Sequence, residues 1–227
     1  MLPVAQVYAH DVPLLPRPAQ SEADLLQVLW CPFDHPEHPR TALFWRVAAT
    51  VTEVLATPPE PPALQFETYL PEPCLLSPEH VTEYPNNLEL DEAIQEKLAN
   101  WSTWQMAKAA ALYSSYEVAP EELYLNMLSV SPGWKIGGWS RWGLTDPVPR
   151  LCPECGTEAE PLLTIATNEW NGSGDSWAPE EEQANPTPLL PGSPPASFTM
   201  IDIAGGYDLQ LHACPTSPNH PHIELIQ

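Results

Sequence analysis

The segment KIGGWSRWGLTDPVPRLCPECGTEAEPLLTIAT, residues 135–167, carries the strongest structural signals of this chain. It joins a Gly-Gly pair, a Cys-Pro-Glu-Cys turn and the apolar run Pro161–Ile165. Two cysteines separated by two residues place their sulfurs on the same side of a tight turn, where both can reach one tetrahedral ion. We therefore expect a small β unit that is clamped by a metal ion and completed by residues near the C-terminus.

Composition narrows the class of protein. The chain has 227 residues, of which 43% are hydrophobic, and nine are Trp, so there is ample material for a core. Thirty residues are Pro. Because Pro lacks a backbone donor and restricts φ, this number favours loops and short strands over long helices.

The charge is strongly unbalanced. Thirty Asp and Glu face eight Lys and Arg, which gives a formal net charge of −22. Such a field repels nucleic-acid phosphates and anionic lipid headgroups, so we expect neither nucleic-acid nor membrane binding. A basic protein partner is permitted. Acidity alone does not require one, since the soluble proteins of some organisms are acidic throughout.

The cysteine usage and the absence of targeting signals point to the cytoplasm. No basic region followed by an apolar core marks a signal peptide at the N-terminus, and no run approaches the roughly 18 apolar residues of a membrane span. The five Cys include one Cys-x-x-Cys pair. An odd number with this spacing favours metal binding in a reducing compartment over a disulfide framework.

Short apolar runs bounded by Pro and Gly predict the strands. The runs at residues 25–30 and 42–51 are joined by a proline-rich turn and predict a hairpin. The runs at residues 198–203 and 207–212 predict a second hairpin, which turns at Gly205-Gly206. The expected strands are Val4–Tyr8, Leu25–Trp30, Ala42–Val51, Phe66–Leu70, Leu123–Val130, Phe198–Ile203 and Tyr207–His212.

One helical segment is expected at about residues 88–115. Apolar residues spaced by four, four and three positions form one stripe, and acidic residues occupy the first turn, where the helix dipole favours them. The Ala-rich stretch Thr103–Ser114 extends the helical character. The stripe consists of Leu90, Ile94, Leu98 and Trp101.

Residues 27–32 and 210–215 repeat one pattern. In both, an apolar strand ends in Cys-Pro and is followed by a His-Pro segment, which suggests a duplicated β unit. The sequence thus predicts an α+β fold of predominantly antiparallel β-sheets. We expect an N-terminal β unit over residues 1–85, a helix plus a C-terminal β unit over residues 86–227, and one compact domain overall.

Cys152 and Cys155 need two further ligands for a closed zinc site. Cys214 with His220, six residues later, is the best pair, because Cys214 follows a strand that can lie beside the Cys-x-x-Cys turn. A reduced cysteine pair without metal and a redox pair remain the alternatives. Strand direction decides which imidazole points inward, so two other histidines stay open as the fourth ligand, His212 and His222.

Other motifs carry weaker chemistry. Cys31, His35 and His38 form a second possible metal cluster, but no Cys-x-x-Cys pair accompanies it. Cys74 fits a small apolar side chain. There is no Gly-x-Ser-x-Gly elbow, and Gly137-Gly138 precedes Trp rather than a helix start, so no catalytic residue and no phosphate loop are predicted.

The order of these motifs resembles a known family. KIGGWSRW, PRLCPEC (residues 149–155), PLLTI (residues 161–165) and a strand that ends at Cys214 are similar to the bacterial YwqG-like proteins of unknown function, actinobacterial type. The resemblance extends more remotely to the programmed-cell-death-2-like proteins. Three features of this chain depart from the family pattern. Trp139 stands where that pattern usually has Pro, and the pair Cys214 and His220 stands in place of a second Cys-x-x-Cys. The earlier Gly-Gly-Pro-x-Trp unit is missing. A truncated or degenerate N-terminal copy is therefore expected.

The resemblance implies a duplicated antiparallel fold and a non-enzymatic role. The eukaryotic relatives are implicated in chaperoning a ribosomal protein, and a basic client suits an acidic surface. The leading hypothesis is a cytoplasmic, zinc-stabilised protein-binding or chaperone-like module. An immunity protein that neutralises a toxin, and a metal-dependent enzyme with an open position at His220, are the alternatives.

Overall fold

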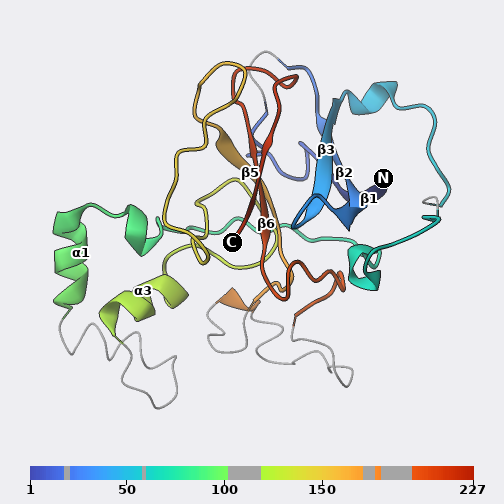
Figure 1. The fold of residues 1–227 in the computed structure, drawn as a ribbon. Coiled ribbons are helices and arrows are strands. Elements are labelled where there is room, and N and C mark those ends of the chain that lie inside the picture. Colours follow the sequence, from blue (N-terminus) through green and yellow to red (C-terminus); the bar gives the residue numbers. More distant parts are fainter. Residues whose placement is uncertain (18–20, 58–59, 102–118, 171–176, 180–195) are drawn as a thin grey trace.

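The computed structural model describes residues 1–17, 21–57, 60–101, 119–170, 177–179 and 196–227. Within these residues the chain forms two antiparallel sheets, of three and four strands, with two α-helices to one side (Figure 1). The predicted α+β class with predominantly antiparallel sheets is confirmed. The helical stretch expected at Thr103–Ser114 lies outside the described residues.

The first sheet has the order β1-β2-β3 and is made of β1 (Leu2–Tyr8), β2 (Leu25–Asp34) and β3 (Pro39–Arg46). The predicted hairpin is confirmed, but its strands have different bounds. Strand β2 continues four residues beyond Trp30, across an irregularity in the register, and the turn closes where the amide of His35 donates to the carbonyl of His38 over 2.8 Å. The third strand ends at Arg46, and residues 48–50 form a 3₁₀ turn instead of more strand.

The second sheet has the order β4-β5-β6-β7. Its strands are β4 (Lys135–Ile136), β5 (Glu160–Ile165), β6 (Leu209–Ala213) and β7 (Ile223–Ile226). All neighbours are antiparallel, and Glu160 at the start of β5 faces Ala213 at the end of β6. The Cys-x-x-Cys turn before β5 therefore lies beside the residues that follow β6.

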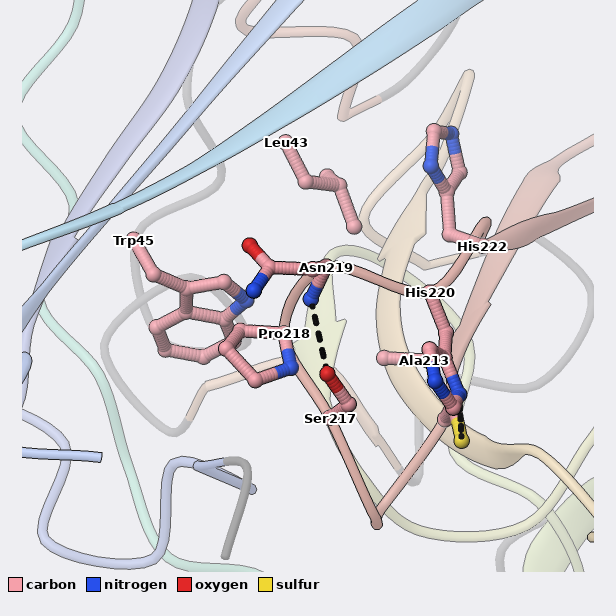
Figure 2. Close-up of a pocket in the computed structure, with 9 residues that line it drawn as sticks. Leu43, Trp45, Ala213, Ser217, Pro218, Asn219, His220 and His222 are labelled. Carbon is pink, nitrogen blue, oxygen red and sulfur yellow. Dashed lines mark hydrogen bonds between the residues drawn. The ribbon is translucent and has the colours of Figure 1, made fainter. Parts of the chain in front are cut away.

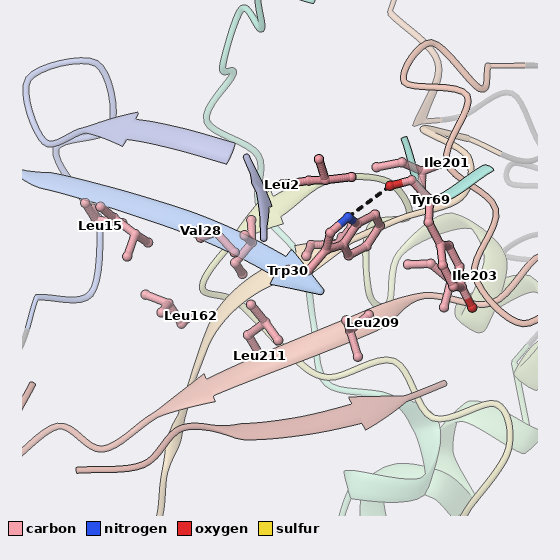
Figure 3. Close-up of a cluster of buried hydrophobic side chains, with 13 residues drawn as sticks. Leu2, Leu15, Val28, Trp30, Tyr69, Leu162, Ile201, Ile203, Leu209 and Leu211 are labelled. Carbon is pink, nitrogen blue, oxygen red and sulfur yellow. Dashed lines mark hydrogen bonds between the residues drawn. The ribbon is translucent and has the colours of Figure 1, made fainter. Parts of the chain in front are cut away.

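The two sheets share one core. Alternate residues of β2 point to one face, as a strand requires, and bury Leu26, Val28 and Trp30. Figure 3 shows Val28 and Trp30 of β2 in one buried cluster with Leu209 and Leu211 of β6. Each large apolar side chain removed from water contributes about 1.5–3 kcal/mol, so this cluster is the main source of stability.

Tyr69 closes one end of this core. It lies in the 3₁₀ turn η2 (Glu67–Tyr69), where the sequence had predicted a strand, Phe66–Leu70. That prediction is wrong. The indole Nε1 of Trp30 donates to the Tyr69 carbonyl over 3.0 Å, and the Tyr69 hydroxyl donates to Asp34 over 2.6 Å. A turn rather than a strand is what presents both ends of Tyr69 to β2.

The helices differ in part from the prediction. Helix α1 (Glu92–Ala99) begins where the Asp91 side chain accepts from the amide of Ile94. Within this helix the predicted apolar stripe is confirmed as core only at Leu98, which is buried, whereas Ile94 is 44% exposed. Helix α3 (Pro120–Met127) replaces the strand that was predicted at Leu123–Val130. Pro in the first turn and acidic residues beside it favour a helix start, and this signal outweighs the apolar run.

The C-terminal hairpin also differs. The prediction paired Phe198–Ile203 with Tyr207–His212, but only the single bridge between Ile203 and Tyr207 forms. Strand β6 instead pairs with β5 and with β7, a strand that the sequence analysis missed. Sheet pairing along the whole length of β6 satisfies more backbone groups than the short hairpin does.

The arrangement agrees with the predicted duplication in one respect. Strands β2 and β6 both lie inside their sheets, both run up to or through a Cys-Pro pair, and both turn back into the next strand. In the described part of the chain, no helix is long and apolar enough to cross a membrane.

Candidate metal centre

The structure brings the four predicted ligands together. One ligand atom from each of Cys152, Cys155, Cys214 and His220 lies within 4.8 Å of all the others. Nδ1 of His220 is 3.3 Å from Sγ of Cys214 and 3.5 Å from Sγ of Cys152, and Sγ of Cys155 is 3.5 Å from Sγ of Cys214. Around a tetrahedral zinc ion, bonds of about 2.3 Å to sulfur and about 2.0 Å to nitrogen separate the ligand atoms by about 3.5–3.8 Å. The donor atoms and their spacing fit zinc.

The Cys-x-x-Cys turn is shaped by its own backbone. The amide of Cys152 donates to the carbonyl of Thr157, and the amide of Gly156 donates back to the carbonyl of Cys152, both over 2.8 Å. Gly156 has a φ of +71°, which glycine adopts without strain. A bridge between Leu151 and Glu158 closes this small hairpin. The local sequence thus holds both thiols at the turn that leads into β5.

The second ligand pair comes from the loop between β6 and β7. Cys214 follows the last residue of β6, and the amide of His220 donates to the Ser217 carbonyl over 3.4 Å. Because β5 and β6 are antiparallel, this loop lies at the same end of the sheet as the Cys-x-x-Cys turn. The site therefore depends on two segments that only the sheet brings together.

The other candidate histidines lie elsewhere. His212 is fully buried, with Nε2 at 3.1 Å from the hydroxyl of Ser140, and burial lowers its pKa to about 3. Nε2 of His222 lies 2.7 Å from the hydroxyl of Thr41. Neither belongs to the cluster, so His220 is the imidazole beside the three thiols.

The second predicted cluster does not form. Nδ1 of His38 lies 3.1 Å from the Pro39 carbonyl, and Cys31 and His35 join it in no common group. Among the described residues, the group of three Cys and one His is the one that meets the spacing of a metal site. The N-terminal counterpart of the site is thus absent from the part of the chain that is described.

Hydrogen bonds in the cluster favour deprotonated sulfur at two positions. Bonds from Thr157 and Thr216 lower the pKa of the Cys155 thiol to about 5, and the bond from Thr216, with its hydroxyl 2.9 Å from Cys214 Sγ, lowers the pKa of Cys214. Burial raises the pKa of Cys152, and contact with Cys214 raises that of His220. Since metal ligands must be deprotonated, metal binding at this cluster releases protons.

A small pocket adjoins the cluster. It measures about 180 Å³ and lies between β3 and the loop that carries His220. Figure 2 shows Leu43 and Trp45 of β3 on one side of the pocket and His220 and His222 on the other. Cys152 and Cys214 are buried and Cys155 is exposed. The pocket is lined by Leu43, Trp45, Ala213, Cys214, Ser217, Pro218, Asn219, His220 and His222.

One residue that fixes the Gly-Gly turn was not predicted from the sequence. The carboxylate of Glu83 accepts from the amide of Ser131 over 2.8 Å and from the amide of Trp139, and it lies 3.0 Å from the amine of Lys135. A Cβ on Gly138 would lie 2.1 Å from this carboxylate, which explains the glycine there. Glu83 thus holds the Gly-Gly turn, but nothing in a chain with thirty acidic residues marks it out.

The segment between the Gly-Gly turn and the cysteines is held by Arg150. Its guanidinium lies 4.9 Å from the centre of the Trp142 ring and donates to the Ser140 hydroxyl over 2.6 Å. Ser140 also contacts His212, but both side chains are buried, so this Ser–His pair is closed to a substrate.

Compared with known proteins, the chain matches no family model, no curated protein and no solved structure.

Proposed function

We propose that this chain is a zinc-stabilised, non-enzymatic protein-binding module of the cytoplasm. The observation that carries the proposal is the convergence of three thiols and one imidazole within 4.8 Å. Thiolate and imidazole are the ligands that zinc prefers in structural sites, and four of them leave no open position for a substrate. The ion would join the Cys-x-x-Cys turn to the β6–β7 loop, two segments that are 59 residues apart between Cys155 and Cys214.

The nature of the partner follows from charge. A net charge of −22 attracts a basic protein and repels nucleic acid and anionic membranes. The reducing cytoplasm suits five cysteines that are all free in the structure. A relationship to the YwqG-like family is part of the proposal and is supported by sequence motifs alone, at residues 135–165 and in the strand that ends at Cys214.

Two measurements test the proposal. The metal content of protein purified without chelator is expected to be one zinc per chain, and Cys214→Ser is expected to remove it, whereas Cys74→Ser, an exposed cysteine outside the cluster, keeps it. Capture from a lysate of the native cell is expected to recover a basic protein that salt releases. Metal-free protein that folds normally contradicts the zinc site, and capture without any basic partner contradicts the binding role.

One observation favours a second candidate, a metal-dependent enzyme. The pocket of about 180 Å³ touches both Cys214 and His220, so a substrate has a route to the ion if His220 dissociates. Cobalt substitution separates the two functions. A closed site predicts a tetrahedral cobalt spectrum that azide or cyanide leaves unchanged, whereas a spectrum that shifts with the anion favours the enzyme.

A further inference from the structure

We propose that residues 72–82, which we name the exposed strap, bind an extended segment of a partner protein in which basic and apolar side chains alternate. This inference rests on the proposed function, because it assigns a surface to the expected basic partner. The strap leaves η2 and runs across the molecule toward α1 (Figure 1).

The strap exposes apolar side chains that a free surface does not need. All eleven of its residues are exposed. Leu75 is 99% exposed, Leu76 51% and Val81 47%. Single exposed leucines are ordinary, but several large apolar side chains in one short segment mark an interaction surface.

Both ends of the strap are fixed. At one end the amide of Glu72 donates to the Thr199 carbonyl over 2.9 Å. At the other end Glu83 pairs with Lys135, and the amide of Tyr84 donates to the Ser129 carbonyl over 3.3 Å. A segment that is held at both ends loses less conformational freedom on binding, which favours affinity.

The backbone between these ends is unpaired. Within the described part of the chain, residues 73–82 form no hydrogen bond, so their carbonyls and all amides except those of Pro73 and Pro78 are open to a partner. An extended peptide can bind such a backbone by main-chain hydrogen bonds, while its alternate side chains supply specificity. Leu75, Leu76 and Val81 provide the apolar contacts.

Charge selects the occupant. Residues 47–96 contain ten Asp and Glu and no Lys or Arg, and of the ten only Glu83 pairs with a lysine among the residues that the structure describes. This field attracts a basic segment. It repels nucleic acid, anionic lipid and a second copy of this chain, whose net charge is also −22.

A peptide titration on the zinc-loaded full chain tests the proposal. The probe is a rhodamine-labelled ten-residue peptide of alternating Lys and Val, and its binding is followed by fluorescence anisotropy at low salt. A Lys/Ser peptide of equal charge and a Glu/Val peptide of equal apolar content serve as controls. We expect the Lys/Val peptide to bind at least tenfold more tightly than either control.

Variants locate the binding on the strap. Leu75→Ser combined with Leu76→Ser is expected to weaken binding of the Lys/Val peptide at least tenfold. Leu14→Ser, a matched control at a residue that is 70% exposed outside the strap, is expected to change it less than twofold. Cys74 lies inside the strap and is exposed, so bound peptide is expected to slow its alkylation by N-ethylmaleimide at least fivefold.

The outcomes separate this inference from the proposed function. Equal affinity of the double variant and the wild type, or unchanged alkylation of Cys74, overturns the strap as the site while a basic peptide still binds. Failure of the Lys/Val peptide to bind at all also overturns the strap. Capture of a basic protein from the native lysate would in that case still support the proposed function, and failure of the capture would contradict it.

Discussion

Replacing Cys214 by serine is expected to lower the stability of the fold by removing the proposed metal link. The variant loses one of the two buried candidate ligands and, with it, the proposed metal link between the Cys-x-x-Cys turn and the β6–β7 loop. The link closes a loop of 59 residues between Cys155 and Cys214. In the chain-entropy treatment of cross-links, a loop of this length contributes about 4 kcal/mol at 25 °C.

This free energy converts into a melting temperature. For a chain of this size each kcal/mol shifts the midpoint by about 2–4 °C, so Cys214→Ser is expected to melt about 8–16 °C below the wild type. The wild type in excess chelator is expected to show the same fall, because removal of the ion breaks the same link.

Thermal unfolding followed by circular dichroism measures the effect. The wild type, Cys214→Ser and the control Cys74→Ser are compared with and without chelator. The control is expected to melt within about 1 °C of the wild type, since Cys74 is exposed and outside the cluster. The metal link would be refuted if chelator left the melting temperature of the wild type unchanged and Cys214→Ser melted at that same temperature.

Three further predictions concern single side chains. Burial raises the pKa of Glu169 from 4.5 to about 7 and that of Asp208 from 3.8 to about 6, so the folded state keeps protons on these two carboxyls that the unfolded state releases, and the stability that they contribute falls as pH rises from about 4 to 7. Glu169→Gln is expected to flatten this fall in melts at pH 5 and pH 7.5, and an unchanged slope contradicts the assignment. His220→Ala is expected to lose zinc in metal analysis, whereas His222→Ala keeps it because that ring bonds Thr41; the reverse would exchange their roles. Gly156→Ala is expected to lower the free energy of unfolding by about 1 kcal/mol in urea because its φ is +71°, and an unshifted midpoint would be inconsistent with that strain.

The ligand set was accessible from sequence because half of it is local. The spacing of Cys152 and Cys155 alone places two sulfurs together, and a strand ending at Cys214 can pair beside them. The imidazole could not be chosen in advance. His212 lies within β6, where it is buried and contacts the hydroxyl of Ser140. His220 reaches the thiols because of the path of the β6–β7 loop, and the sequence has no periodic pattern that predicts this path.

The misassigned elements share a physical cause, since short segments follow tertiary contacts more than their own pattern. Phe66–Leu70 forms a turn because Trp30 and Asp34 bind Tyr69 there. The four residues of β7 follow a His-Pro-His tail and form a strand only because β6 offers a free edge. The role of Glu83 could not be predicted from the sequence either, because it depends on contacts with Lys135 and the Gly-Gly turn that form only in the folded chain.

The central claim is that three thiolates and one imidazole bind zinc, and X-ray absorption at the zinc edge tests it most directly. Protein purified without chelator is predicted to show a shell of three sulfurs at about 2.3 Å and one nitrogen at about 2.0 Å from the ion. His220→Ala, which is expected to lose zinc, should show no such shell. Absence of zinc, or a shell of oxygen and nitrogen without sulfur, would contradict the claim.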